Sequence, residues 1–140
     1  MIRILSCAAS LSLLAAGAAG AAAHQATEAQ LRELVSALVE QARPQTPLRL
    51  DSERVWTGVR ADGVEIIYDV AIERDLGADE LPALRRVQAA SDPIAMCADA
   101  TIAYLIGLGA RLRLVYTDAA GDRFETLVGN CPAAAGSAGP

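Results

Sequence analysis

The sequence contains no lysine, because all 12 of its basic residues are arginines. Its one histidine, His24, lies near the N-terminus. The absence of lysine excludes Schiff-base chemistry and a lysine general base. A lone histidine near the chain end leaves the folded domain without a base for a Ser-His-Asp or Cys-His nucleophilic site. We therefore predict that the protein is not an enzyme.

Runs of basic residues and clusters of metal ligands are also lacking. The formal net charge is −5 at pH 7, which makes nucleic acids and anionic membrane surfaces poor partners. His24 with its terminal amine would chelate copper only weakly. Asp118, Asp122 and Glu125 could offer oxygen ligands to calcium, but their spacing fits a hairpin turn better. We expect neither a metal nor a cofactor.

The first 23 residues have the organisation of a secretory signal. Arg3 is followed by an apolar stretch over 4–16 and by small residues over 17–23. This apolar core of about a dozen residues is shorter than the roughly 20 that span a bilayer. We predict cleavage after Ala23, no membrane insertion of the mature chain, and a periplasmic or secreted protein with net charge −6, since Arg3 is lost from −5. Cys7 does not follow the apolar stretch, where a lipid-modified cysteine would lie, which argues against lipid attachment.

Two cysteines, Cys97 and Cys131, would remain after the signal is removed. An even number of cysteines in an exported chain favours a disulfide. The competing interpretations are a metal-binding pair, for which other ligands are lacking, and a reactive thiol. A bridge of this length would stabilise the fold by roughly 3 to 4 kcal/mol.

Helical signals occur in three places. Residues 27–30 fit a capping box that opens a first amphipathic helix. A second helix is expected within 77–90. Asp92-Pro93 then has the character of an N-cap and first helical residue, and Gly109 that of the residue after the last turn of a third helix.

Strand signals occur in two pairs. Residues 55–60 and 64–72 alternate on either side of Asp62-Gly63, which is a strong hairpin pattern. A second hairpin joins 112–116 to 124–128. The element order α-ββ-αα-ββ predicts one antiparallel sheet of four strands with three helices on one face.

We expect residues 24–132 to form a single α+β domain, followed by a disordered tail over 133–140. The simplest arrangement of this domain conflicts with the disulfide, because it places Cys97 and Cys131 at opposite ends, about 15 Å or more apart. A bridge needs Cα atoms within about 7 Å. Either the third helix crosses the sheet steeply, or residues 129–130 turn back over it.

Trp56 is the most distinctive candidate for binding. The alternation places it opposite Val59, on the sheet face that the helices leave open, together with Ile67. Tryptophan is enriched among interface hot spots. We predict that Trp56 and Ile67 contact a protein partner; the alternative is that the helices cover Trp56 as well.

The run formed by Cys97, Gly109, residues 114–118, Gly121 and Cys131 resembles a C-terminal pattern of small exported bacterial proteins of unknown function. The resemblance implies export and a disulfide but no activity. In size and element order the chain is also similar, more loosely, to periplasmic accessory proteins such as secretion pilotins and small enzyme inhibitors. We expect a non-enzymatic exported accessory domain that binds another, unidentified protein; the alternative is a periplasmic small-ligand-binding protein.

Overall fold

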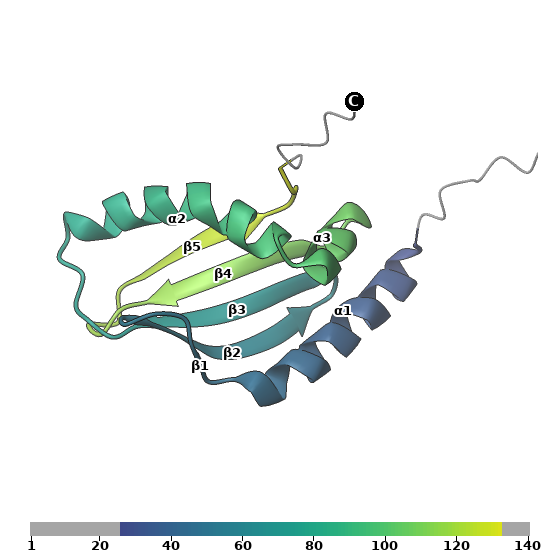
Figure 1. Cartoon of the computed structure of the whole chain (residues 1–140), viewed down its shortest axis with the longest axis horizontal. Helices are drawn as coiled ribbons and strands as arrows, with labels where there is room; N and C mark the ends of the chain where they lie inside the picture. Colours follow the sequence, from purple (N-terminus) through teal and green to yellow (C-terminus); the bar gives the residue numbers. More distant parts are fainter. Residues whose placement is uncertain (1–25, 133–140) are drawn as a thin grey trace, which may run out of the picture.

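The computed structural model describes residues 26–132 of the chain (Figure 1). The predicted signal segment 1–23, His24 and the predicted tail 133–140 lie outside the described residues. The elements are, in chain order, α1 (Glu28–Ala42), the 3-10 helix η1 (Arg43–Gln45), β1 (Leu48–Arg49), β2 (Arg54–Asp62), β3 (Glu65–Ile72), α2 (Glu80–Cys97), α3 (Ala100–Gly107), β4 (Arg111–Thr117) and β5 (Arg123–Val128).

The strands form one sheet of five in the order β1-β2-β3-β4-β5. Neighbouring strands are antiparallel except β3 and β4, which are parallel. The α+β class and the three α-helices are confirmed. The expected four-stranded antiparallel sheet is wrong, because β1 adds a short edge strand. In addition, α2 and α3 carry the chain from the end of β3 back to the end of the sheet where β3 begins, and this crossover makes β4 parallel to β3.

The boundary between the second and third helices also differs from the expectation. Pro93 lies inside α2, which continues to Cys97. The break comes at Asp99, whose side chain accepts hydrogen bonds from the backbone N–H groups of Thr101 and Ile102 and so caps α3. Asp92 does not act as a cap, because its carboxylate is bound to side chains of the sheet.

The helix break explains how the two cysteines meet. Cys97 ends α2 at the end of the domain where β4 begins. Since β5 is antiparallel to β4, it ends at the same place, and Cys131 follows it closely. The predicted disulfide between Cys97 and Cys131 is confirmed, with a Cα–Cα distance of 5.6 Å. The expected separation arose from placing Cys97 near the start of a helix instead of at its end.

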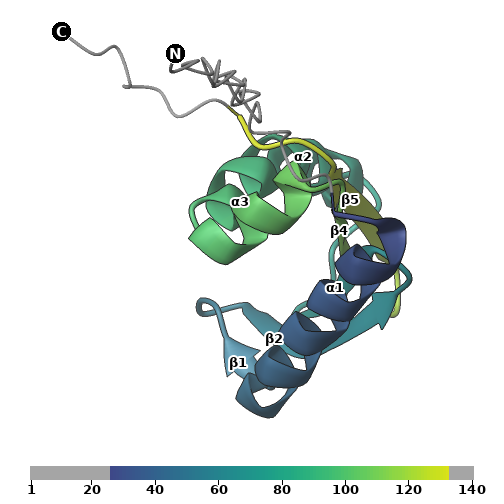
Figure 2. The same cartoon turned by 90° about the vertical axis from the view of Figure 1, so that its right-hand side faces the viewer.

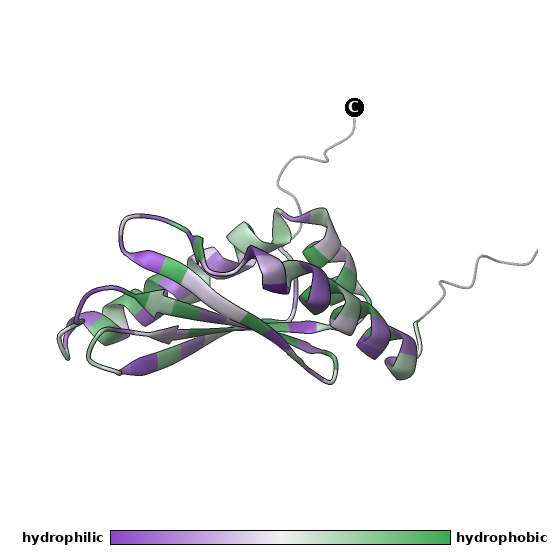
Figure 3. Ribbon diagram, turned by 90° about the horizontal axis from the view of Figure 1, so that it is seen from below, coloured by the Kyte–Doolittle hydropathy of each residue, from purple (hydrophilic) through white to green (hydrophobic). Residues whose placement is uncertain are grey.

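The core lies between the helices and one face of the sheet (Figure 2). Alternate strand residues point into it, and the alternation is visible along the strands in Figure 3. The strand residues of this apolar core are Val59, Ile66, Tyr68, Val70, Ile72, Leu112, Leu114, Tyr116, Phe124 and Val128. The first helix contributes Leu31, Val35 and Val39 and begins with the predicted capping box at Thr27.

A buried polar cluster holds α2 against the sheet. The Asp92 side chain is 5% exposed and accepts hydrogen bonds from the hydroxyls of Tyr116, at 2.9 Å, and Thr126. One turn earlier, the Gln88 carbonyl oxygen accepts from Arg54 at 3.2 Å. Desolvation raises the pKa of Asp92, although the two hydroxyls oppose this shift.

Replacement of Asp92 with Asn tests this buried charge. An unfolded aspartate has a pKa of about 3.9, and the folded value lies above it. The folded state therefore binds the proton more tightly. The free energy of unfolding of the wild type, relative to Asp92→Asn, should increase as the pH is lowered from neutral through the folded pKa towards about 4. Urea unfolding of both proteins across this range measures the difference; a difference that decreases on acidification would contradict the assignment.

Removal of the disulfide should cost much of the stability. The bridge closes a loop with a sequence separation of 34, so the double change Cys97→Ala and Cys131→Ala should lower the free energy of unfolding by roughly 3 to 4 kcal/mol. Urea denaturation is the measurement, and reduced wild-type protein is the control. A loss below about 1 kcal/mol would show that removing the bridge increases the conformational entropy of the unfolded chain only slightly.

Candidate functional site

Trp56 lies on the helix-covered face of the sheet, contrary to the expectation from alternation. The register of β2 on β3 shifts between Trp56 and Gly58, which leaves Thr57 without a partner on β3. Such a bulge changes the alternation by one residue. Trp56 and Val59 therefore point to the same face, and Trp56 packs against the core. The sequence offered no clear signal beyond a glycine in the middle of the strand, which is a common mark of a bulge.

Ile67 lies on the helix-free face as expected, but it is only 7% exposed. It is flanked in the sheet by Arg60 of β2 and Arg113 of β4. Both arginines are bound across the strands in the ion pairs Arg60–Asp69, Arg113–Glu65 and Arg113–Glu125. Trp56 and Ile67 are thus on opposite faces and cannot form one patch, and a binding role for Ile67 stays a prediction.

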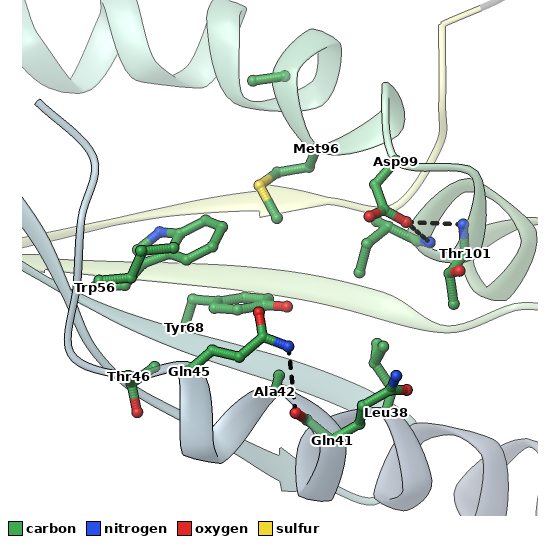
Figure 4. Close-up of a pocket in the computed structure, with 13 residues that line it drawn as sticks. Leu38, Gln41, Ala42, Gln45, Thr46, Trp56, Tyr68, Met96, Asp99 and Thr101 are labelled. Atoms are coloured by element: carbon green, nitrogen blue, oxygen red, sulfur yellow. Dashed lines mark hydrogen bonds between the residues drawn. The ribbon is translucent and has the colours of Figure 1, made fainter.

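A cavity of about 300 Å³ lies beside Trp56, between α1 and the junction of α2 with α3 (Figure 4). Trp56 and Tyr68 form its floor, with ring centroids 5.0 Å apart and planes inclined at 31°. Apolar walls come from all three helices and polar groups line the rim. The wall residues are Leu38, Ala42, Ala95, Met96 and Ile102, and the polar ones Gln41, Gln45, Thr46, Asp99 and Thr101.

The Trp56 indole Nε1 is the one side-chain nitrogen or oxygen in residues 26–132 that is buried without a hydrogen-bond partner. A buried donor without an acceptor costs about 1 to 3 kcal/mol. Buried polar groups are almost always paired, so an exception marks a place where the native state carries an unfavourable group. The exception lies at the floor of this cavity.

A second groove of about 490 Å³ lies nearer the N-terminus of α1 and shares no lining residue with the first. It is lined by Gln30, Leu34 and Ala37 of α1 and by Tyr104 and Leu108 at α3. Leu34 is 41% and Tyr104 61% exposed, which is high for large apolar side chains. The α1 residues lie one to two turns before those of the first cavity on the same helix, and Tyr104 follows Thr101 by one turn of α3. We call the two cavities together the α1–α3 groove.

One titratable side chain of the α1–α3 groove, Tyr68, has a shifted pKa. Burial, and then the charge of Asp99, raise the pKa of Tyr68, so its hydroxyl stays protonated at physiological pH. No group of three or more His, Cys, Asp or Glu side chains that could hold a metal ion occurs among the described residues. None of the helices in that part of the chain is long and apolar enough to cross a bilayer.

The acidic hairpin considered for calcium forms a turn. The Asp118 carboxylate accepts backbone N–H groups from Leu76 at 2.9 Å, Asp122 at 2.8 Å and Ala120 at 3.0 Å. These bonds, that of Leu76 first, lower the pKa of Asp118. The carboxylate of Asp118 thus ties the β4–β5 turn to the segment that precedes α2.

Three solved structures have this fold. A candidate secreted protein of Pseudomonas aeruginosa matches with a TM-score of 0.62 and 14% identity over 71% of this chain and 89% of its own. The type II secretion pilotin EpsS of Vibrio vulnificus matches with 0.61 and 15% over 72% and 89%. The type II secretion pilotin AspS of Vibrio cholerae matches with 0.57 and 18% over 78% and 95%.

No family model and no curated protein matches the sequence. The identities to the solved structures are low, so the likeness establishes a shared fold and does not extend to activity. The expected similarity to secretion pilotins in size and element order is confirmed at the level of fold. The resemblance of the run between Cys97 and Cys131 to exported proteins of unknown function stays a prediction.

Two substitutions of Trp56 separate its packing from its N–H. Trp56→Phe removes the unpaired donor and keeps an aromatic ring, so the free energy of unfolding should be unchanged or higher. Trp56→Ala removes packed area and should lower it by about 3 kcal/mol. Thermal and urea unfolding measure both. If Trp56→Phe were as destabilising as Trp56→Ala, the indole N–H would have a partner in solution.

Proposed function

We propose that this protein is an exported, non-enzymatic accessory protein that binds a segment of another protein in the α1–α3 groove. The observation that carries the proposal is the floor of the groove, where the rings of Trp56 and Tyr68 form an aromatic surface. Aromatic residues are the most frequent anchors of protein interfaces. The names of two solved structures with this fold, both pilotins of type II secretion systems, support an accessory role in secretion.

The length of the groove favours a chain segment over a small molecule. Its lining residues on α1 extend from Gln30 to Ala42, which corresponds to about 18 Å at 1.5 Å per residue. Small-molecule sites are usually single concave pockets that enclose most of their ligand. A groove with Leu34 and Tyr104 exposed along its side fits an apolar face of a partner better.

The helix-free sheet face is a weaker candidate for the same contact. Its apolar residues Ile67 and Val115 are 7% and 2% exposed. The charged groups around them already pair with one another, as Arg113 does with Glu65 at 2.9 Å. A partner there would have to displace these ion pairs or leave them buried, and burial of charged groups is costly.

The non-enzymatic part of the proposal rests on the side chains available. Lysine is absent, and the described cysteines are joined in the disulfide. The remaining candidates are carboxylates and hydroxyls. Two buried carboxylates already accept hydrogen bonds within the fold, Asp118 from a backbone N–H and Asp92 from a hydroxyl. These hydrogen bonds give both carboxylates a structural role.

Site-specific photocrosslinking in the exporting bacterium tests the proposal. A photoreactive residue at Ala37 or Ala95, which line the groove, should give adducts of protein size. The matched control is Ala90, which is exposed on the same helix as Ala95 but outside the groove, and should give none. In addition, Ala95→Trp should weaken binding of the captured partner about tenfold or more, and Ala90→Trp should not.

The outcomes separate the candidate functions. Adducts at Ala90 alone would place the contact elsewhere and contradict the groove. A small molecule that co-purifies in native mass spectrometry and is displaced by Ala95→Trp, without any protein adduct, would favour the small-ligand alternative.

A further inference from the structure

A second surface lies at the other side of the molecule, where β5 forms the last strand of the sheet in the part of the chain that is described. The Asp118 N–H donates to the Asp122 carbonyl oxygen, and hydrogen-bonded pairs alternate along an antiparallel ladder. The backbone N–H and C=O groups of Arg123, Glu125 and Leu127 consequently point away from β4. These groups are free to bind another strand.

A groove of about 590 Å³ runs beside this edge, between α2 and β5. Its apolar part is formed by Leu81, Pro82 and Phe124, and its charged part by Arg85, Arg86 and Arg123. All three arginines are exposed. Their position together at one strand edge is notable in a chain with a net charge of −5.

The three arginines have no carboxylate partner among the described residues, although most of the other described arginines do. Glu125 also lines the groove, but it is bound to Arg113 at 2.7 Å on the sheet face. The groove therefore presents unneutralised positive charge next to unpaired backbone groups. Each feature alone is common at a surface, and their combination specifies an anionic ligand with an extended backbone.

We infer that the β5 edge binds an extended acidic segment of a second protein, which adds to the sheet as a further strand. Backbone hydrogen bonds to Arg123, Glu125 and Leu127 would hold the segment. Because alternate side chains of a strand point to opposite faces, carboxylates on the α2 side of the segment would meet Arg85 and Arg86, and a carboxylate on the helix-free side would meet Arg123. This surface is separate from the α1–α3 groove, so one molecule could hold two segments at once.

Charge decides against the other occupants of a strand edge. The β5 edge of a second copy would bring no free carboxylate to the three arginines, because its Glu125 is already bound to Arg113. Residues 133–140 contain no Asp or Glu side chain for the cluster. An acidic segment satisfies both the edge and the cluster.

Titration of the isotope-labelled mature protein with a synthetic probe tests the inference. The probe is a nonapeptide of alternating glutamate and valine, and the control is its lysine–valine counterpart. The acidic peptide should shift the amide NMR signals of Arg123, Glu125 and Leu127 in a saturable way that weakens with added salt. The basic peptide should leave them unchanged. No shift at millimolar acidic peptide would overturn the inference.

Variants with equal charge provide the second arm. The triple change Arg85→Gln, Arg86→Gln and Arg123→Gln should weaken peptide binding about tenfold or more. The matched triple change Arg32→Gln, Arg43→Gln and Arg111→Gln alters net charge equally and should have no effect. Leu127→Pro removes one outward N–H from the edge, so it should weaken binding when Leu127→Ala does not.

Three further outcomes would count against the acidic strand. If both triple variants weakened peptide binding equally, binding would depend on net charge alone and not on the β5 edge. Concentration-dependent dimerisation through β5 would make a second copy the occupant. Binding to vesicles rich in anionic lipid, without any response to the peptide, would make a membrane the occupant. Each result is independent of the photocrosslinks in the α1–α3 groove, so the two proposals can fail separately.

Discussion

The parallel pairing of β3 with β4 is the constraint on which the rest of the structure depends. A parallel neighbour forces the chain to return along the whole length of the sheet before β4 can begin. Residues 80–107 make this return as α2 and α3. The return places Cys97 at the end where β5 also ends, sets α3 beside α1, and leaves α2 along the outer strand. The disulfide, the α1–α3 groove and the β5 edge are all consequences of that path.

The long return helix needs an anchor, and the buried cluster under its middle supplies one. Asp92 receives two hydroxyls from β4 and β5, the two strands that follow the crossover. A buried carboxylate adds little net stability compared with an apolar residue, but it has strict geometric demands. Its partners fix α2 at one position along the strands. This position in turn determines where Met96 and Asp99 lie in the lining of the groove.

Local sequence patterns predicted much of the fold. The capping box at Thr27, the turn at Asp62-Gly63 and the helix end at Gly109, with φ of 106°, were all predictable because each depends on a few neighbouring residues. Pairing between the two hairpins was not, since nothing local distinguishes a parallel from an antiparallel neighbour. The expected start of the third helix at Asp92-Pro93 placed Cys97 too far from Cys131 for a disulfide. This conflict was a correct sign that the helix boundary was misplaced, because Cys97 ends α2.

The candidate site was predictable in type of residue but not in place. Trp56 was identified from its chemistry, whereas its face depended on a bulge of a single residue that alternation cannot reveal. Asp92-Pro93 failed for a related reason, since a preferred cap can be diverted when a tertiary partner offers its carboxylate better hydrogen bonds. Errors of this kind arise wherever one residue serves the core instead of the local turn.

The distribution of charge separates the surfaces of this domain by what they still lack. On the helix-free face, arginines and carboxylates of neighbouring strands neutralise one another and cover Ile67. The charged groups of this face therefore already have partners. In the α1–α3 groove, the large apolar side chains of Leu34 and Tyr104 are exposed to water. At the β5 edge, Arg85, Arg86 and Arg123 lack carboxylate partners, and the outward backbone groups lack a neighbouring strand. Unsatisfied groups of different kinds call for different ligands, because an apolar face cannot neutralise arginines and an acidic strand gains little from an aromatic floor. The two proposed ligands therefore differ in chemistry and would bind to separate surfaces of one domain.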